Sequence, residues 1–189
     1  MKELIIIGGA NGSGKTTFAK ELIKETSYYF LNADEIERNL EEPKSDVTQV
    51  KAGRLFFEKL EALLEKEQNF IVESTLSGKY LVKIIEKLKQ ENYKIRIVYV
   101  FLESPEICIE RIKIRVIFGG HFIPDEIVKR RYYRSKENFW NVYKNMADEW
   151  QLFYNSFTES PVQVAIGNAG SYLVENESFM QEFLNDVKI

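Results

Sequence analysis

An eight-residue stretch near the amino end constrains the fold more than any other part of the sequence. It reads Gly9-Ala10-Asn11-Gly12-Ser13-Gly14-Lys15-Thr16, in which two glycines enclose four residues and are followed by Lys and Thr. Glycines let such a loop fold tightly around a polyphosphate, because they tolerate positive φ angles and close approach of the backbone. In this pattern Lys15 reaches the β- and γ-phosphates, and Thr16 offers its hydroxyl to Mg²⁺. The stretch therefore predicts a binding site for ATP or GTP.

Strand-like and helix-like segments alternate along the 189 residues. Short apolar runs predict strands, and apolar residues at helical spacing predict the helices between them. Strands are expected at residues 4–7, 28–32, 69–72, 95–101 and 150–154, followed by a hairpin at 162–166 and 171–174. Helices are expected after the glycine-rich loop and at residues 46–64, 81–88, 105–116, 125–146 and 179–187. This alternation favours an α/β fold, with a single domain over residues 1–189 and a mainly parallel five-stranded sheet.

Composition narrows the classes of protein that the chain can belong to. A formal charge of −3 gives the whole molecule no reason to seek nucleic acid or an anionic membrane. One His and one Cys rule out a His/Cys zinc cluster, and the single Cys108 fits a reducing compartment. No apolar run reaches 18 residues, and residues 1–3 lead straight into a strand rather than a signal-peptide core. We therefore expect a cytoplasmic protein with no membrane partner.

Polar residues stand at the carboxyl ends of the second and third expected strands, where ligands of open α/β sheets bind. Asp34 ends the second strand and is predicted to be the general base for an acceptor hydroxyl; a helix-capping role is the alternative. Glu73 ends the third strand in place of the usual Asp, and is predicted to hold Mg²⁺ or grip the acceptor. Thr75 is predicted to contact the acceptor beside it, although Ser74 and Thr75 can instead cap the next helix. The similar Glu103 is expected to be structural.

Positive charge is concentrated between Arg111 and Arg134. This segment holds seven Lys or Arg residues and two acids, which gives 7 − 2 = +5. Arg111 and Arg115 are four residues apart and share one helix face. Between the two expected helices, Gly119-Gly120 can act as a hinge. We predict a lid at about residues 111–134 whose arginines neutralise a transferring phosphoryl group; an exposed basic helix face is the alternative for any single Arg.

Two further residues are candidates by position alone. His121 follows the hinge and is assigned to the substrate, with a hydrogen bond to nearby backbone as the alternative. Asn155 follows the last core strand, where it can read an adenine; an ordinary turn residue is the alternative.

Together these residues resemble the zeta-toxin family of P-loop kinases. The match covers nearly the whole chain and rests on an ordered set of segments: Gly9 to Thr17, Asn32 to Glu35, Glu73 to Thr75, Arg115 to Tyr132 with its Gly-Gly-His-x-Ile-Pro stretch, and Ala147 to Ser156. The phosphate loop alone is shared by many unrelated proteins, so the ordered set makes the resemblance specific.

The resemblance implies a nucleotide-kinase-like three-layer sandwich with the strand order 2-3-1-4-5. Taken with the positions of the residues, it predicts Mg²⁺ at Thr16 and Glu73, acceptor contacts from Asp34, Glu73, Thr75 and His121, and catalysis by Lys15, Asp34, Arg115 and Arg131. Contacts with ATP or GTP are expected from Gly9, Asn11, Gly12, Ser13, Gly14, Lys15, Thr16, Thr17, Arg111, Arg130 and Asn155. Zeta toxins phosphorylate a sugar hydroxyl of UDP-N-acetylglucosamine and are neutralised by a helical antitoxin, so these are the expected acceptor and partner.

Other functions remain open at this point. A kinase of nucleic-acid ends would use the +5 segment as a track for the backbone, although the acidic chain disfavours it. An ABC-type ATPase is hinted at by Leu76-Ser77-Gly78, but Lys79-Tyr80 breaks that signature. Nucleotide binding without catalysis is the remaining alternative.

Overall fold

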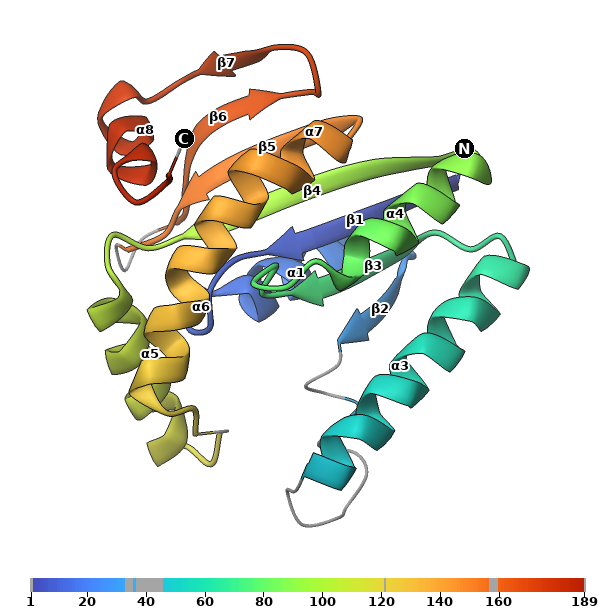
Figure 1. The fold of residues 1–189 in the computed structure, drawn as a ribbon, viewed down its shortest axis with the longest axis horizontal. Helices are drawn as coiled ribbons and strands as arrows, with labels where there is room; N and C mark the ends of the chain where they lie inside the picture. Colours follow the sequence, from blue (N-terminus) through green and yellow to red (C-terminus); the bar gives the residue numbers. More distant parts are fainter. Residues whose placement is uncertain (1, 33–35, 37–45, 121, 157–159, 189) are drawn as a thin grey trace.

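The structure of the protein, a computed structural model, describes residues 2–32, 36, 46–120, 122–156 and 160–188. Strands and helices alternate over most of this length (Figure 1). The strands are β1 (Lys2–Gly8), β2 (Tyr29–Asn32), β3 (Phe70–Ser74), β4 (Tyr93–Phe101), β5 (Glu149–Tyr154), β6 (Val162–Gly167) and β7 (Tyr172–Val174). The helices are α1 (Lys15–Glu25), α3 (Asp46–Glu65), α4 (Tyr80–Gln90), α5 (Pro105–Ile117), α6 (Asp125–Asn138), the π-helix η1 (Phe139–Tyr143), α7 (Lys144–Met146) and α8 (Glu177–Leu184).

The described strands form one sheet in the order β2-β3-β1-β4-β5-β6-β7. The pairs β2–β3, β3–β1, β1–β4 and β4–β5 are all parallel, which confirms the order 2-3-1-4-5 of the first five strands. The hairpin expected after them joins the same sheet, because β6 pairs antiparallel with β5 and β7 with β6. The sheet is therefore longer than expected by two antiparallel strands.

Helices cover both faces of this sheet and give it three layers (Figure 1). Helix α1 packs against the face that carries Ile5, Ile7 and Ile71. Helices α3, α4 and α8, together with η1, cover the opposite face in the largest apolar cluster. A separate cluster around Cys108 and Tyr132 joins α5 to α6 beside the sheet. None of the helices within the described ranges is long and apolar enough to cross a membrane.

Two helices differ from their sequence-based expectations. The segment expected as one helix over 125–146 contains the π-helix η1 between α6 and α7. The last helix begins at Glu177, because the Asn176 side-chain oxygen accepts a hydrogen bond from the Phe179 N–H at 3.0 Å, and it ends at Leu184 rather than near residue 187. The start of α5 is as expected, with Ser104 as its capping residue.

Candidate active site

The glycine-rich loop connects β1 to α1 and is packed so closely that side chains are excluded from two of its positions. Gly14 has a φ of 97°, and a Cβ there would lie 2.4 Å from the Asn155 side-chain nitrogen. Gly12 has a φ of 83°, and its Cβ would lie 2.7 Å from the Cys108 carbonyl oxygen. The backbone therefore takes up a cradle that only glycine permits, which is the shape a polyphosphate requires.

Polar groups of the loop face inward. Lys15 is 6% exposed, and its ammonium donates a hydrogen bond to the Ala10 carbonyl at 2.8 Å, so the side chain arches over the loop. Ser13 is buried, and its hydroxyl has no hydrogen-bond partner in the part of the chain that the structure describes. Thr16 and the exposed Thr17 follow in the first turn of α1, where backbone N–H groups attract anions. The cradle, the ammonium and the buried hydroxyl fit a bound nucleoside triphosphate.

Glu73 lies at the centre of the site. The Thr16 hydroxyl is 2.9 and 3.1 Å from its two carboxylate oxygens, and the Asn32 side-chain amide donates to one of them at 2.8 Å. The Lys15 ammonium is 4.0 Å from the same carboxylate. Strand β3 lies between β1 and β2, and Glu73 is opposite both Ile7 and Asn32. The phosphate loop that follows β1 and the end of β2 therefore both lie beside this side chain. A carboxylate beside the loop threonine occupies the position expected of a magnesium ligand.

One arginine of the lid contacts the loop directly. The Arg131 guanidinium on α6 donates to the Asn11 side-chain oxygen at 3.2 Å. Arg111 on α5 donates to the backbone carbonyls of Asn155 and Ser156 at 2.8 and 3.2 Å. It thus holds the turn that packs against the loop.

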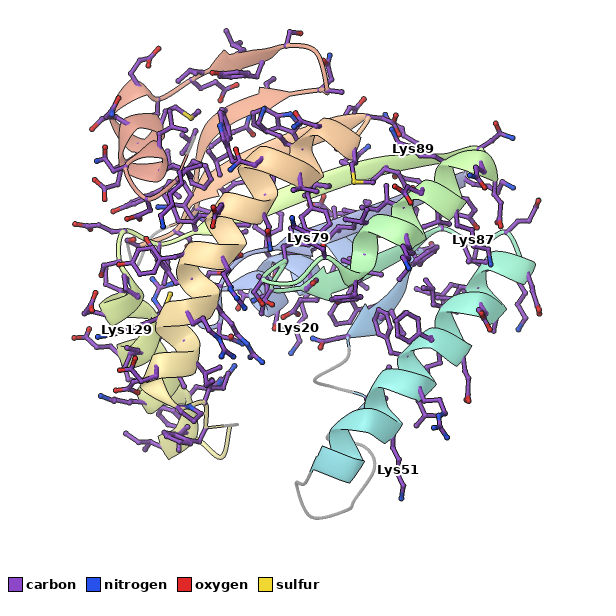
Figure 2. All side chains as sticks on the ribbon, in the orientation of Figure 1. Lys20, Lys51, Lys79, Lys87, Lys89 and Lys129 are labelled. Carbon is purple, nitrogen blue, oxygen red and sulfur yellow. The ribbon has the colours of Figure 1, made fainter. Side chains whose placement is uncertain are left out.

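For the other basic residues of α5 and α6, no contact with the phosphate loop is described. Arg115 is exposed near the end of α5, where its aliphatic part packs against Gly120. Arg130 is exposed and adjacent to Arg131, so the two side chains leave α6 about 100° apart. Lys129 lies on the α5 side of the lid (Figure 2), with its ammonium 3.6 Å from the Glu106 carboxylate.

Asn155 contacts the phosphate loop from the end of β5. Its side-chain amide donates to the Ser13 carbonyl at 2.8 Å. The residue therefore supports the nucleotide site through the loop backbone, and contact with an adenine base stays a prediction.

The loop after β3 presents two hydroxyl groups. The hydroxyls of Thr75 and Ser77 are 2.9 Å apart, and both side chains are half-buried. The alternative that Ser74 and Thr75 cap the next helix does not hold, since the N-cap of α4 is Lys79 without a side-chain cap. Instead the Ser74 hydroxyl accepts hydrogen bonds from the Leu76 N–H and the Tyr80 hydroxyl.

The thiol of Cys108 is buried beneath the loop and takes no charge at neutral pH. Burial raises the pKa of Cys108 from 9.0 to about 12, although the nearby Lys15 and Arg111 charges oppose this shift. The side chain therefore acts as an apolar support for the loop rather than a nucleophile.

Two of the predicted site residues are not described by the structure, and one residue of the site was not predicted. Asp34 and His121 fall outside the described residues. Asn32 was not predicted as a Glu73 partner, although an amide that ends a buried strand next to a carboxylate is a signal that could have indicated it. Glu103 is exposed, and it accepts a hydrogen bond from the Tyr154 hydroxyl at 3.2 Å, as a structural residue would.

The mainly parallel sheet, with its phosphate loop and the arginine-bearing helices α5 and α6, defines a protein with a P-loop kinase fold. The chain belongs to the zeta-toxin family, since the family model described as "Zeta toxin" matches residues 1–160.

Individual relatives agree with this membership. The chain is 31% identical over 124 residues to an uncharacterized protein of Haemophilus influenzae, a match that covers 66% of this chain and 88% of the relative. It is 28% identical over 165 residues to a cytidylate kinase of Saccharolobus islandicus, covering 81% of this chain and 82% of that kinase.

Solved structures share the fold. The AvrRxo1-ORF1:ORF2 complex with ATP superposes with a TM-score of 0.77 at 18% identity over 97% of this chain, which spans 63% of that longer chain. A protein of the PezAT chromosomal toxin-antitoxin system of Streptococcus pneumoniae gives a TM-score of 0.59 at 18% identity, covering 86% of this chain and 71% of that one.

Proposed function

We propose that this protein is an ATP-dependent phosphotransferase that transfers the γ-phosphoryl group to a hydroxyl of a small molecule. The observation that carries the proposal is the Glu73 network, in which one carboxylate meets the loop hydroxyl of Thr16, the loop ammonium of Lys15 and the amide of Asn32. When bound, ATP supplies the phosphoryl group and Mg²⁺ spreads its negative charge. GTP is the alternative donor.

Thr16 and Glu73 would hold Mg²⁺. Both offer the hard oxygen ligands that this ion prefers. No cluster of three or more His, Cys, Asp or Glu occurs among the described residues. Two protein oxygens, with phosphate and water oxygens completing the shell, are how Mg²⁺ commonly binds in nucleotide sites.

The cations have separate roles in this proposal. Lys15 binds the β- and γ-phosphates, and Arg131 approaches the same region, as its contact with Asn11 supports. Arg115 stabilises the charge of the transferring group after the lid moves. Arg111 and Arg130 contribute to nucleotide binding, the former through the Asn155 turn.

The acceptor side consists of Asp34, Glu73, Thr75 and His121. Asp34 removes the proton from the acceptor hydroxyl, because a carboxylate beside Mg²⁺ can accept it as the phosphoryl group leaves ATP. The first acceptor to test is UDP-N-acetylglucosamine, following the zeta-toxin family. A relative named cytidylate kinase supports an acceptor that contains a nucleotide.

An antitoxin is the proposed protein partner. The structural likeness to a protein of the PezAT toxin-antitoxin system supports this proposal. Copurification of the protein with the product of a neighbouring gene would test it.

The decisive experiment incubates the protein with Mg-ATP or Mg-GTP and a panel of hydroxyl acceptors, followed by mass spectrometry. The panel contains UDP-N-acetylglucosamine, nucleoside monophosphates, simple sugars and a 5′-hydroxyl oligonucleotide. We expect one phosphoryl group to be added to a sugar nucleotide. An Asp34→Asn variant should bind nucleotide but lose transfer by at least about 10²-fold, the loss typical of a missing general base.

Three results would contradict the proposal. Absence of transfer to every acceptor would contradict the proposed kinase activity. Undiminished transfer by Asp34→Asn would contradict only the assignment of Asp34 as the general base. Salt-sensitive transfer to the oligonucleotide alone would favour a nucleic-acid kinase, for which the exposed cations of α6 would form the track.

A further inference from the structure

The loop between β3 and α4, residues 75–78, contains a strained residue next to the phosphate loop. Leu76 has a φ of 54°, a conformation that is unusual for a branched side chain, and it is fully buried. A Cβ on Gly8, the last residue of β1, would lie 2.5 Å from the Leu76 side chain. Leu76 thus fills the space at the base of the phosphate loop. Strain of this kind persists only where the surrounding structure enforces it.

Three side chains from α6 and η1 hold the carbonyl groups of this loop. The Ser135 hydroxyl donates to the Thr75 carbonyl, the Asn138 amide to the Leu76 carbonyl at 2.9 Å, and the Tyr143 hydroxyl to the Gly78 carbonyl at 2.6 Å. Ser135 is itself oriented, because its oxygen accepts a hydrogen bond from the buried Tyr99 hydroxyl at 2.7 Å. The loop backbone is therefore fixed from one side along its length.

The π-helix contributes to this arrangement. Asn138 and Tyr143 are five residues apart, and the i→i+5 pairing of a π-helix aligns such residues better than the 3.6-residue turn of an α-helix. In Figure 2, Lys79 marks the point at which the held loop enters α4. With the carbonyls of Thr75, Leu76 and Gly78 bound from one side, the paired hydroxyls of Thr75 and Ser77 are held at a fixed place in the loop.

Helix α6 also reaches the nucleotide side of the site. Arg131, one turn before Ser135, contacts Asn11 of the phosphate loop. One rigid element therefore touches both the loop that cradles phosphate and the loop that carries Thr75.

We propose that Ser135, Asn138 and Tyr143 are positioning residues, which fix the place of the loop of residues 75–78 relative to the phosphate loop. This inference rests on the proposed phosphotransfer. They do not touch the substrates. They hold Leu76 in its strained conformation, and so keep the hydroxyls of Thr75 and Ser77 at a fixed place relative to the transferred group.

The test uses Ser135→Ala, Asn138→Ala and Tyr143→Phe in the full chain. Tyr143→Phe removes one oxygen and preserves the ring packing, so it keeps the test meaningful if another variant folds poorly. Asn145→Ala is the matched control, since Asn145 lies just beyond Tyr143 and is exposed, and its described hydrogen bonds, with the Asn141 carbonyl and the Lys144 ammonium, do not involve the loop of residues 75–78. Ser135→Thr retains the hydroxyl and should restore the behaviour of the original protein.

The first readout is amide hydrogen exchange of the peptide that spans residues 74–78, with the non-hydrolysable analogue Mg-AMP-PNP bound. We expect exchange at least tenfold faster in the three variants, with the dissociation constant of the analogue changed less than twofold. Unchanged exchange in Asn138→Ala and Tyr143→Phe would overturn the proposal.

The second readout is transfer to UDP-N-acetylglucosamine. The KM for this acceptor should rise about tenfold in the variants while the KM for ATP stays constant, and Ser135→Thr should reverse the change. An equal rise in both KM values would indicate a merely structural role and overturn the proposal. If the original protein does not phosphorylate this acceptor, the proposed acceptor fails, while the exchange measurement still decides the positioning role.

Discussion

Glu73 shows how much of this site depends on one side chain. A hydroxyl and an ammonium from the start of α1 and an amide from the end of β2 meet at its carboxylate. A glutamine has nearly the same shape but one negative charge less, so it would separate the effect of charge from that of packing.

We predict that Glu73→Gln lowers the rate of Mg-ATP-dependent transfer by about 10²-fold or more, because the charged oxygen that we propose as a metal ligand is lost. Nucleotide binding without Mg²⁺ should change little. Steady-state kinetics with a Mg²⁺ titration, beside equilibrium binding of a fluorescent ATP analogue, would measure both effects.

Glu103→Gln is the matched control, since Glu103 also follows an apolar strand but contacts Tyr154. Equal losses in the two variants would show that the Glu73 charge has no special part in the reaction.

Residue types and spacing singled out several residues that the structure brings together, while their roles stay predictions. Glu73 lies beside Thr16, and Arg131 contacts Asn11; each was picked from a local pattern, since it belongs to a recognisable strand end or helix. The Asn32 contact with Glu73 and the Arg111 contact with the 155–156 turn depend on which strands are neighbours, and that information is not local in the sequence.

At the scale of elements, α6 was predicted as a basic helix, and it also carries a buried ion pair that the sequence did not indicate. Lys136 is 1% exposed, and its ammonium lies 2.6 Å from the Asp186 carboxylate, just beyond α8. Burial lowers the pKa of Lys136, whereas the Asp186 carboxylate opposes that shift. The rings of Phe101, Tyr132 and Phe183 surround the ammonium at 5.1 to 5.3 Å. A helical pattern of charge cannot reveal such a pair, because the partner lies fifty residues away.

We predict that Asp186→Asn destabilises the protein by about 2–4 kcal/mol at neutral pH, because it leaves a buried ammonium without its counter-charge. Urea unfolding followed by tryptophan fluorescence would measure the change. Lys136→Met in the same background should recover most of the loss, since it removes the unpaired charge and preserves the side-chain volume.

Lys89→Met serves as the control, because its ion pair with Asp148 is solvent-exposed and should contribute less than about 1 kcal/mol. A loss in the control as large as that of Asp186→Asn would argue against a special role for the buried pair.

At the scale of the whole molecule, the order of the five parallel strands was predictable and the length of the sheet was not. The order follows from the resemblance of the ordered motifs to known kinases. The hairpin was expected from two strand-like runs, at 162–166 and 171–174, that flank a short segment with a glycine at each end. Its attachment to β5 depends on the apolar surface of residues such as Leu152 and Ala165, which the local pattern alone does not pair. The π-helix also has no signature in the sequence, because its contacts come from other strands and loops.

We predict that the folded state loses stability as the pH rises above about 9. Burial raises the pKa of Cys108 from 9.0 to about 12, and burial also raises the pKa of Tyr99, Tyr132 and Tyr143 above their usual 10.0. Above those ordinary values the unfolded chain releases protons that the folded chain retains, so the free energy of unfolding falls by up to about 1.4 kcal/mol per pH unit for each group. Lys136 acts in the opposite direction, since its lowered pKa makes stability rise with pH up to 10.5.

Urea midpoints between pH 7 and 11 would test this expectation. The contributions of Cys108 and the three tyrosines should be flat below pH 9, and above that pH they should outweigh the opposing effect of Lys136, so that the midpoints fall. In a Cys108→Ala variant the fall should begin near pH 10, where the tyrosines start to ionise in the unfolded chain. A midpoint that rises between pH 9 and 11 would contradict the assignment.

The Lys136–Asp186 pair also sets an order of events while the protein is being made. The lid helix leaves the ribosome fifty residues before the carboxylate that neutralises its ammonium. At translation rates of about 5–20 residues per second, roughly 3–10 seconds pass before the carboxylate that lets this ammonium be buried has been synthesised. During this interval the nucleotide loop is already synthesised, but the helix that contacts it lacks its C-terminal anchor. The final placement of α6 is therefore linked to synthesis of residue 186, and a ribosome stalled before codon 186 would hold a chain in which α6 is not fully stabilised.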